Sequence, residues 1–491
     1  MIWPFRKRPP PIRDRWDLSA PLFSINGRDT FTVGDACQGI QVFGSTGSGK
    51  SSAVVATIIR SYLSAGFGGL LLTTKPTDRD DYTRWCQETG RFDDLVIFSP
   101  TSDLRFNPID AELRRQDAGA GLSENIVALL ENITNIGERN QGQGGGQEDA
   151  SYWKRTNRQL TRNSVELLTM ATGKLSVPDL YRLVISAPTS RDQLRSEEWK
   201  NSSFCFQCLV EAERKPKSPQ QQTDFELVAD FFLIEFANLS DKTRSVVVST
   251  FTSTLDVLNR GTIRELLGTT TNIRPEAALD GKLILIDLPI KVFGEVGMAV
   301  QILWKYCFQL AMERRDIREN SRPVFILSDE SHLVAVAGSD QKFQSTARSS
   351  RTATVYSTQS ISNYLTALGD KGDAAVYSLL GNLQCQVFTQ QTDVKTNTYA
   401  SELIGRTRQY LMNANNSYQT PNFFELFPDT QGQLSTGVSE TYEYEVQPSV
   451  FATLRKGGPP HFQVDGIMYQ GGRQFSQTGG PWTPVTFSQQ F

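Results

Sequence analysis

Short apolar runs, separated by segments with the period of a helix, occupy the outer parts of the chain. Each run is bounded by polar or turn residues; the runs are 41–43, 69–73, 95–98, 283–288, 324–328, 354–357 and 385–388. Continuous apolar runs of this length are typical of parallel strands buried on both faces. Helical segments between them favour βαβ units. The pattern therefore predicts an α/β fold.

The middle of the chain has a different pattern. Residues 111–274 show helical periodicity without convincing strands, most clearly at 151–171 and in the apolar stretch 225–238. We therefore expect an all-α domain inserted into the α/β domain. Within it, the Gly- and Gln-rich segment 137–149 has no apolar anchor and is predicted to be a mobile loop.

These patterns divide the chain into five parts. The predicted boundaries are a basic N-terminal tail at 1–17, the first part of the nucleotide-binding domain at 18–110, the helical insertion at 111–274, the second part of the nucleotide-binding domain at 275–470, and a C-terminal tail at 471–491. From Met412 onward we expect loops with a hairpin or two.

Composition narrows the classes of protein. The 491 residues carry a net charge of -3, which argues against a protein that coats nucleic acid through bulk positive charge. No apolar run approaches the 18 residues that a membrane-spanning helix needs, and the N-terminus lacks an apolar signal core, so a cytoplasmic location is expected. Only Cys205 and Cys208 form a Cys-x-x-Cys pair, and the histidines lie far away. Reduced thiols are the favoured interpretation, with metal binding a minor alternative.

One segment fits the phosphate-loop pattern G-x-x-x-x-G-K-[ST]. It consists of Gly44, Ser45, Thr46, Gly47, Ser48, Gly49, Lys50 and Ser51, with Ser52 next in the chain. A predicted strand precedes it and a helix-compatible segment follows, whereas a Gly-Ser linker, the alternative, does not sit between a strand and a helix. We expect these residues to bind ATP, with Lys50 reaching the β and γ phosphates and the Ser51 hydroxyl on Mg²⁺.

A second candidate element is an apolar strand that ends in two acids, Asp329 and Glu330. Asp329 is predicted to hold Mg²⁺ directly or through water, and Glu330 to polarise the attacking water. Taken alone, the strand could equally end in a solvated acidic turn. Its pairing with a good phosphate loop favours the catalytic interpretation.

Further candidates surround the strand at 354–357. Gln359 follows this strand and could sense the γ phosphate, although a loop-capping glutamine is as common. Arg348 and Arg351 precede it. Arginine stabilises phosphoryl charge, and in ring ATPases a neighbouring subunit often donates it, but a surface ion pair is the usual role of such a residue.

The helical insertion contains one basic face. Four basic residues recur at helical spacing beside two aromatic ones: Lys154, Arg155, Arg158 and Arg162, with Tyr152 and Trp153. Such a face could hold the backbone of single-stranded DNA and stack its bases, although a solvated helix face is the commoner meaning.

The order of these elements resembles the type IV coupling proteins of the TraG/TraD kind, in the FtsK/HerA branch of RecA-like P-loop ATPases. The segments that carry the resemblance are RFNPID, KTRSVVVSTFTSTLDVL, GKLILIDLPI, LSDESHL, RSSRTATVYSTQS, LLGNLQCQVFTQQTDVKTNTYASELIG and FATLRKGGPPHF. They are collinear from about Val42 to Gly405, with the last in the C-terminal part, which makes them more specific than any single motif.

The resemblance implies a RecA-like nucleotide-binding domain with an inserted all-α domain, assembled as a homo-hexamer around a channel. It implies ATP-driven delivery of single-stranded DNA with its bound relaxase, or of protein substrates, to inner-membrane components of a secretion system. Lys50, Ser51, Asp329, Glu330 and Gln359 fall on the family's motifs, and Arg348 resembles its trans-acting arginine finger.

Two departures from the family pattern stand out. Most members begin with a transmembrane region, which this chain lacks. The chain is therefore expected to be either a membrane-free form or one that depends on a separate membrane partner, which would place it peripherally at the inner membrane. Thr74 replaces an acid of the family beside Lys75 and Pro76, and we assign Lys75 no role. A HerA- or FtsK-like DNA-processing or plasmid mobilisation ATPase stays open as an alternative, as does a receptor whose helical domain docks secretion signals.

Overall fold

A computed structural model describes residues 15–117, 119–138, 147–368, 372–417 and 433–490. The chain forms two compact units. The terminal unit comprises residues 1–61 and 355–491, and the central unit comprises residues 62–354.

The terminal unit contains a five-strand arrangement in the order β13-β12-β9-β3-β8. The strands are β3 (Ile40–Phe43), β8 (Thr352–Thr358), β9 (Cys385–Phe388), β12 (Gln463–Gln470) and β13 (Trp482–Ser488). β3 runs parallel to β8 and β9, and all of its residues are buried. β12 is antiparallel to both β9 and β13. The Phe43 and Phe388 rings stack at 5.4 Å between centroids, in line with the parallel core that the apolar runs predicted.

Helices and two ribbons complete the terminal unit. The helices are α1 (Val33–Ala36), η1 (Lys50–Val55), α2 (Ala56–Ser64, which ends just inside the central unit), α15 (Ile361–Leu368), α16 (Gly372–Asn382), α17 (Val394–Ile404) and α18 (Pro448–Thr453). A short ribbon joins β1 (Pro21–Ser24) to β2 (Thr30–Thr32).

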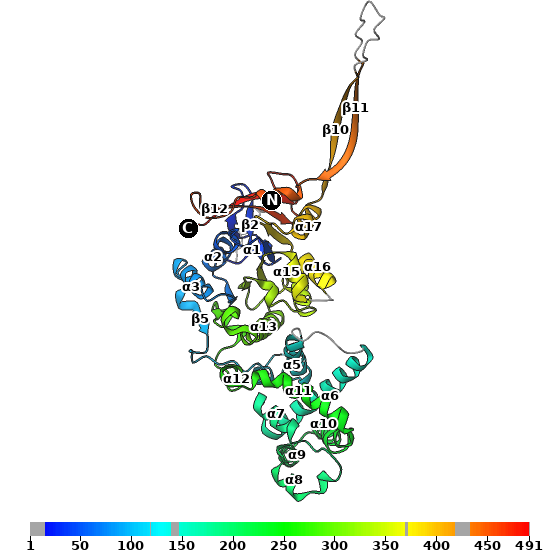
Figure 1. Ribbon diagram of the computed structural model, residues 1–491. Helices are drawn as coiled ribbons and strands as arrows, with labels where there is room; N and C mark the ends of the chain where they lie inside the picture. The colour runs from blue at the N-terminus through cyan, green and yellow to red at the C-terminus, as the bar shows by residue number, and fades with distance from the viewer. Residues whose placement is uncertain (1–14, 118, 139–146, 369–371, 418–432, 491) are drawn as a thin grey trace, which may run out of the picture. The chain divides into compact units, whose positions relative to one another are not determined.

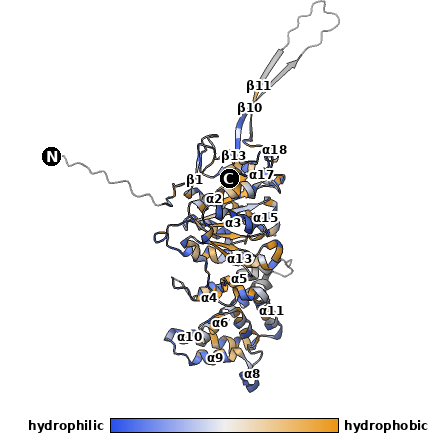
Figure 2. Cartoon of the chain, turned by 90° about the vertical axis from the view of Figure 1, so that its left-hand side faces the viewer, coloured by the Kyte–Doolittle hydropathy of each residue, from blue (hydrophilic) through white to orange (hydrophobic). Residues whose placement is uncertain are grey.

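A long hairpin of β10 (Arg406–Ser417) and β11 (Gln433–Tyr444) projects from the rest of the terminal unit (Figure 1). Its register runs from Arg406 opposite Tyr444 to Ser417 opposite Gln433, and among the described residues no third strand pairs with it. The base of β10 is hydrophilic (Figure 2).

The central unit contains four parallel strands in the order β7-β4-β6-β5. They are β4 (Gly68–Leu72), β5 (Leu95–Phe98), β6 (Leu283–Ile286) and β7 (Val324–Ser328). The other elements of this α/β part are α3 (Asp78–Glu88), η2 (Phe92–Asp94), η6 (Pro275–Asp280), α13 (Ile290–Arg314), η7 (Ser331–Leu333) and α14 (Ser339–Thr346). Trp304 of α13 packs on Phe98 and Phe106, at 5.0 and 4.4 Å between ring centroids.

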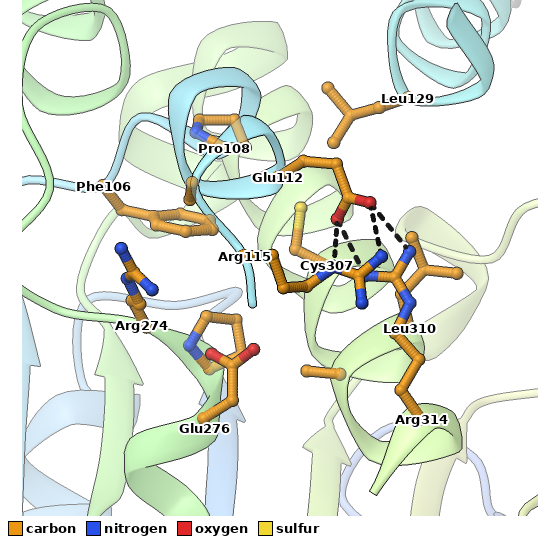
Figure 3. Close-up of a pocket in the computed structure, with 13 residues that line it drawn as sticks. Phe106, Pro108, Glu112, Arg115, Leu129, Arg274, Glu276, Cys307, Leu310 and Arg314 are labelled. Atoms are coloured by element: carbon orange, nitrogen blue, oxygen red, sulfur yellow. Dashed lines mark hydrogen bonds and ion pairs between the residues drawn. The ribbon is translucent and has the colours of Figure 1, made fainter. Parts of the chain in front are cut away.

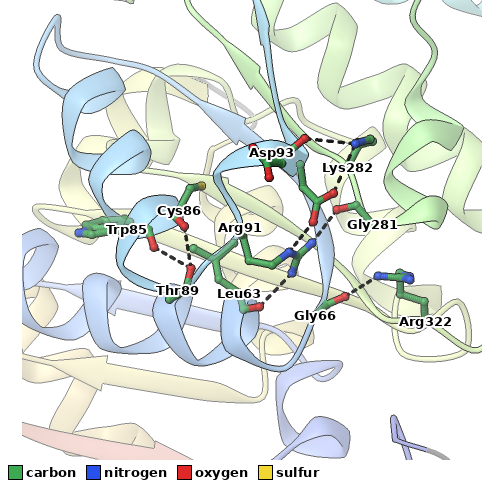
Figure 4. Close-up of polar contacts among 11 residues, drawn as sticks. Leu63, Gly66, Trp85, Cys86, Thr89, Arg91, Asp93, Gly281, Lys282 and Arg322 are labelled. Atoms are coloured by element: carbon green, nitrogen blue, oxygen red, sulfur yellow. Dashed lines mark hydrogen bonds and ion pairs between the residues drawn. The ribbon is translucent and has the colours of Figure 1, made fainter.

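One arginine connects three segments of this unit (Figure 4). The Arg91 guanidinium donates to the carbonyl oxygens of Leu63 at 2.9 Å and Gly281 at 2.7 Å, and it pairs with Asp94 at 2.7 Å. Since the guanidinium is largely buried, these partners satisfy donors that would otherwise be costly to bury.

Every described element between β5 and η6 is helical. These elements are α4 (Pro108–Leu113), α5 (Ser123–Glu138), α6 (Gln147–Thr172), α7 (Val177–Ile185), η3 (Gln193–Arg195), α8 (Glu197–Ser202), α9 (Phe204–Arg214), α10 (Pro219–Asp230), η4 (Phe231–Glu235), η5 (Phe236–Asn238), α11 (Asp241–Leu258) and α12 (Gly261–Leu267). The predicted fold class, α/β with an all-α insertion, is confirmed.

A buried carboxylate fastens the start of the insertion to α13 (Figure 3). Glu112 of α4 accepts hydrogen bonds from Arg314 at 2.7 Å, from Arg115 at 3.0 Å and from Asn125 at 2.8 Å. These groups lie beside a small cavity that Cys307 helps to line.

The terminal parts differ from what the pattern predicted. Residues 471–491, expected to be a tail, contain β13, whose Thr483, Val485 and Phe487 are buried against β12. β12 pairs with β13 as an antiparallel hairpin, in line with the hairpin or two expected from Met412 onward. Most of the predicted loop at 137–149 and most of the predicted tail at 1–17 lie outside the described residues; the described ends of 137–149 belong to α5 and α6.

All six cysteines are buried, and none of them is joined in a disulfide. In the part of the chain that the structure describes, no group of three or more His, Cys, Asp and Glu side chains could hold a metal ion. Nor is any helix of those residues both long and apolar enough to span a bilayer.

Candidate nucleotide site

The phosphate loop connects the buried β3 to η1 in the terminal unit. Gly47 and Gly49 have φ angles of 76° and 88°, in the left-handed region that favours glycine. Gly49 also has no room for a side chain, because a Cβ there would lie 2.3 Å from the Cγ2 of Val464. The loop therefore leads directly into a helix, whose N-terminus carries the positive end of the helix dipole.

Polar contacts fix the loop against the ends of the neighbouring strands. The Gly44 N–H donates to the carbonyl of Thr358, the last residue of β8, at 3.3 Å, and the Ser45 N–H donates to the Gln390 carbonyl at 2.9 Å. Thr389 donates its hydroxyl proton to Ser48 at 3.0 Å. Lys50 and Ser48 are buried, whereas Ser51 is half-buried and Ser52 exposed.

Gln359 follows β8 directly, so it lies at the same edge as the phosphate loop. Its carbonyl accepts a hydrogen bond from the side chain of Gln391, whose own oxygen accepts the N–H groups of Thr392 and Asp393 at 2.8 and 2.9 Å. Gln390 also bonds the Ser45 hydroxyl through its side chain. The sequence did not point to Gln390 or Gln391; their only signal is their position directly after a predicted strand.

The two predicted acids lie at the carboxyl end of β7 in the central unit. Asp329 and Glu330 are both buried, and Glu330 has a φ of 55°, which is rare for a residue other than glycine. Such backbone strain concentrates at functional sites. His332 lies with its Nδ1 3.7 Å from the Glu330 carboxylate.

Lys75 lies beside the first of these acids, a contact that the sequence did not reveal. Its Nζ is 3.3 Å from the Asp329 carboxylate, and the Thr74 hydroxyl donates to the Asp329 carbonyl at 2.8 Å. Burial lowers the pKa of Lys75, but attraction to Asp329 and Asp78 outweighs it and leaves the pKa raised. Lys75 is therefore a charged partner of Asp329.

Asp78 supports the same turn. Its carboxylate accepts the N–H groups of Thr74 at 2.7 Å and Lys75 at 2.8 Å, while burial raises its pKa. Thr74 stands where the family has an acid. In this chain the acid that contacts the turn is Asp78, four residues after Thr74.

The oxygen donors suit magnesium. A serine hydroxyl, present at Ser51 in the terminal unit, and a carboxylate, present at Asp329 in the central unit, are ligand types that Mg²⁺ accepts, and this ion usually takes its remaining ligands from water and substrate phosphates.

The two arginines before β8 have different environments. Arg351 is half-buried at a φ of 48°; its guanidinium donates to the Ser321 carbonyl at 2.9 Å, and its own carbonyl accepts from the Val324 N–H. Arg351 is therefore engaged at the amino end of β7, opposite to the end that carries the acids. Arg348 is exposed three residues earlier.

The predicted basic face of α6 is partly neutralised. Arg158 and Arg162 both form ion pairs with Glu124 of α5, and Arg158 also pairs with Glu131 at 3.4 Å. Arg155 is exposed. The side chains of Tyr152, Trp153 and Lys154 lie outside the described residues.

One part of the chain matches a known family. The family described as the TraM recognition site of TraD and TraG matches residues 323–447. Among curated proteins, none matches the sequence.

Solved structures of one coupling protein share the fold. The bacterial conjugative coupling protein TrwBdeltaN70, in an unbound monoclinic form, has a TM-score of 0.56 at 15% identity, over 94% of this chain and 87% of that chain. TrwB in complex with ADP and Mg²⁺ has a TM-score of 0.57 at 15% identity, over 94% and 87%. TrwB with the non-hydrolysable GTP analogue GDPNP has a TM-score of 0.57 at 15% identity, over 95% and 90%. The matching segment and the shared fold agree with the predicted resemblance to the TraG/TraD type of conjugative coupling proteins.

Proposed function

We propose that the chain is an ATP-hydrolysing motor of a conjugation or type IV secretion system, which delivers single-stranded DNA with bound relaxase, or protein substrates, to the channel. The observation that carries this proposal is the phosphate loop, with left-handed Gly47 and Gly49 between a buried strand and a helix. The likeness to a coupling protein solved with ADP and Mg²⁺ supports it.

Each candidate residue has one role in this proposal. Lys50 neutralises the β and γ phosphates, Glu330 orients the attacking water, and Gln359 responds to loss of the γ phosphate. Ser51 and Asp329 would hold Mg²⁺, which supplies charge neutralisation to the phosphates when bound. Arg348 of a neighbouring copy completes the site in a ring, for which we propose a homo-hexamer.

The test is magnesium-dependent ATP hydrolysis, measured at several protein concentrations with and without single- and double-stranded DNA. Lys50→Ala and Glu330→Gln are each expected to reduce hydrolysis by a factor of about 100 or more. Glu330→Gln is expected to retain nucleotide binding. The exposed residues Lys174 and Glu402 provide matched controls, as Lys174→Ala and Glu402→Gln.

Two outcomes would contradict parts of the proposed function. Wild-type rates in both site variants would overturn the proposed active site. Hydrolysis that depends on both residues but is indifferent to DNA would replace DNA by protein as the favoured substrate.

A further inference from the structure

The last residues of the described chain contact the phosphate-loop helix. The side-chain Nε2 of Gln489, directly after β13, donates a hydrogen bond to the Ser52 hydroxyl oxygen at 2.7 Å. The two residues are 437 positions apart in the sequence and both belong to the terminal unit.

Hydrogen bonds fix which end of the Gln489 amide faces Ser52. The Gly458 N–H donates to Oε1 of Gln489 at 2.6 Å, and a backbone N–H can only donate. The amide oxygen therefore faces Gly458, and the NH₂ group faces Ser52. The Gln489 backbone N–H also donates to the Phe462 carbonyl at 2.8 Å, so the residue is held at its main chain and at its side chain.

Close packing leaves this amide little freedom. A Cβ added to Gly457 would lie 2.4 Å from Nε2 of Gln489, and a Cβ added to Gly49 would lie 2.3 Å from Val464 of β12. The segment around Gly457, the strand β12 and Gln489 therefore lie directly against the phosphate loop.

The orientation of the amide determines what Ser52 can do. A hydroxyl has one proton to donate and lone pairs that accept. Because the NH₂ group of Gln489 only donates, the Ser52 oxygen accepts from it, and the Ser52 proton stays available for an acceptor. Phosphate oxygens are acceptors, and Ser52 stands two residues after Lys50 in the phosphate-loop helix.

We propose that Gln489 is a positioning residue of the nucleotide site, which holds the Ser52 hydroxyl as a hydrogen-bond donor to a nucleotide phosphate. This inference rests on the proposed function, because it deepens the same site. The proposal adds to the nucleotide site a residue that directly follows the C-terminal strand β13 and lies outside the phosphate-loop motif.

The test is the affinity of the full-length protein for ADP with Mg²⁺, measured by titration calorimetry. Gln489→Ala is expected to weaken binding by about threefold to tenfold, the range of one hydrogen bond. Gln489→Glu is expected to weaken it further, because a carboxylate accepts the Ser52 proton and repels the phosphates.

A double-mutant cycle separates positioning from general damage. In a Ser52→Ala background, Gln489→Ala is expected to have no further effect, while part of the Gln489→Glu loss persists as charge repulsion. Gly457→Ala, which displaces the amide without removing it, is expected to reproduce Gln489→Ala. The neighbouring exposed Gln490, changed to Ala, is the matched control. Urea unfolding checks that each variant is folded.

The outcomes distinguish this inference from the proposed function. If Lys50→Ala abolishes ADP binding but folded Gln489→Ala binds as tightly as the wild type, the role of Gln489 is wrong and the nucleotide site stands. Full additivity of Ser52→Ala and Gln489→Ala would also overturn it. If the wild type fails to bind ADP, both proposals fall.

Discussion

Asp329 lies buried at the end of β7, and the side chain of Lys75, 35% exposed, is its charged partner at 3.3 Å. A buried carboxylate that loses its partner keeps its desolvation cost but loses the compensating attraction. The partial exposure of Lys75 lets water replace some of that attraction.

We therefore expect Lys75→Met to lower the free energy of unfolding by about 1–3 kcal/mol, between the values for exposed and buried ion pairs. Urea unfolding at pH 7 measures it. The exposed Lys174, changed to Met, serves as the control and should leave stability nearly unchanged. Equal stability of Lys75→Met and the wild type would show that Asp329 does not need this partner.

The site residues that the sequence predicted are those whose motif lies next to its strand in the chain. Lys50, Ser51, Asp329 and Glu330 stand in motifs directly after predicted strands, so the motif and its context occur together in the chain. Lys75 and Gln489 escaped prediction because their partners lie 254 and 437 positions away. Their partners are defined only by how the strands assemble.

At the scale of elements, α3 contains a thiol that makes the unfolding equilibrium depend on pH. Burial raises the pKa of Cys86 from 9.0 to about 12, with Arg91 opposing and Asp94 adding to the shift. The folded chain therefore keeps this proton at a pH where the unfolded chain has lost it. The resulting stability is complete below about pH 9 and is lost as the pH rises toward 12.

We expect the wild type to lose about 1 kcal/mol more stability between pH 8 and pH 10 than Cys86→Ala does. Urea unfolding of both proteins at the two pH values gives this difference, in which other titrating groups cancel. Identical losses in the two proteins would contradict the assignment to Cys86.

The hairpin of β10 and β11 is an element whose removal the unit should tolerate. Tyr410 and Tyr442 are 60% and 56% exposed, so the described base of the hairpin buries little apolar surface. Arg406 and Tyr444 lie opposite each other, and a two-residue turn can join neighbouring antiparallel strands.

Replacing residues 407–443 by Asn-Gly is expected to leave the free energy of unfolding within about 0.5 kcal/mol of the wild type. ADP affinity should also be unchanged. Urea unfolding and calorimetry test both expectations. A large loss of stability would show that the hairpin packs on the unit.

Elements of the α/β core were predictable to the extent that they are buried on both faces. Each of the seven predicted strands exists, because parallel core strands produce uninterrupted apolar runs. From Met412 onward only a hairpin or two was expected, and β12 and β13 were not located individually because they mix glycine, proline and polar residues with their buried positions. In β13, burial alternates along the strand, and Pro484 interrupts the pattern.

At the scale of the whole molecule, the position of Arg348 bears on assembly. The Arg351 carbonyl bonds the amino end of β7, and Arg348 precedes it, whereas Glu330 follows the carboxyl end. Five strand residues span roughly 17 Å, so Arg348 and Glu330 of one chain lie at opposite ends of β7. Arg348 can therefore complete a site only when a second copy presents it.

Mixing two inactive variants tests this arrangement. Lys50→Ala has an intact Arg348, and Arg348→Ala has an intact phosphate loop. If each site combines the loop of one copy with Arg348 of the next, random rings from an equal mixture contain both intact groups at about a quarter of their sites. ATP hydrolysis should then recover toward that fraction of the wild-type rate. If Arg348 acts within its own chain, mixing the two variants should restore no ATP hydrolysis. If Arg348→Ala alone hydrolyses ATP at the wild-type rate, Arg348 is not part of the site.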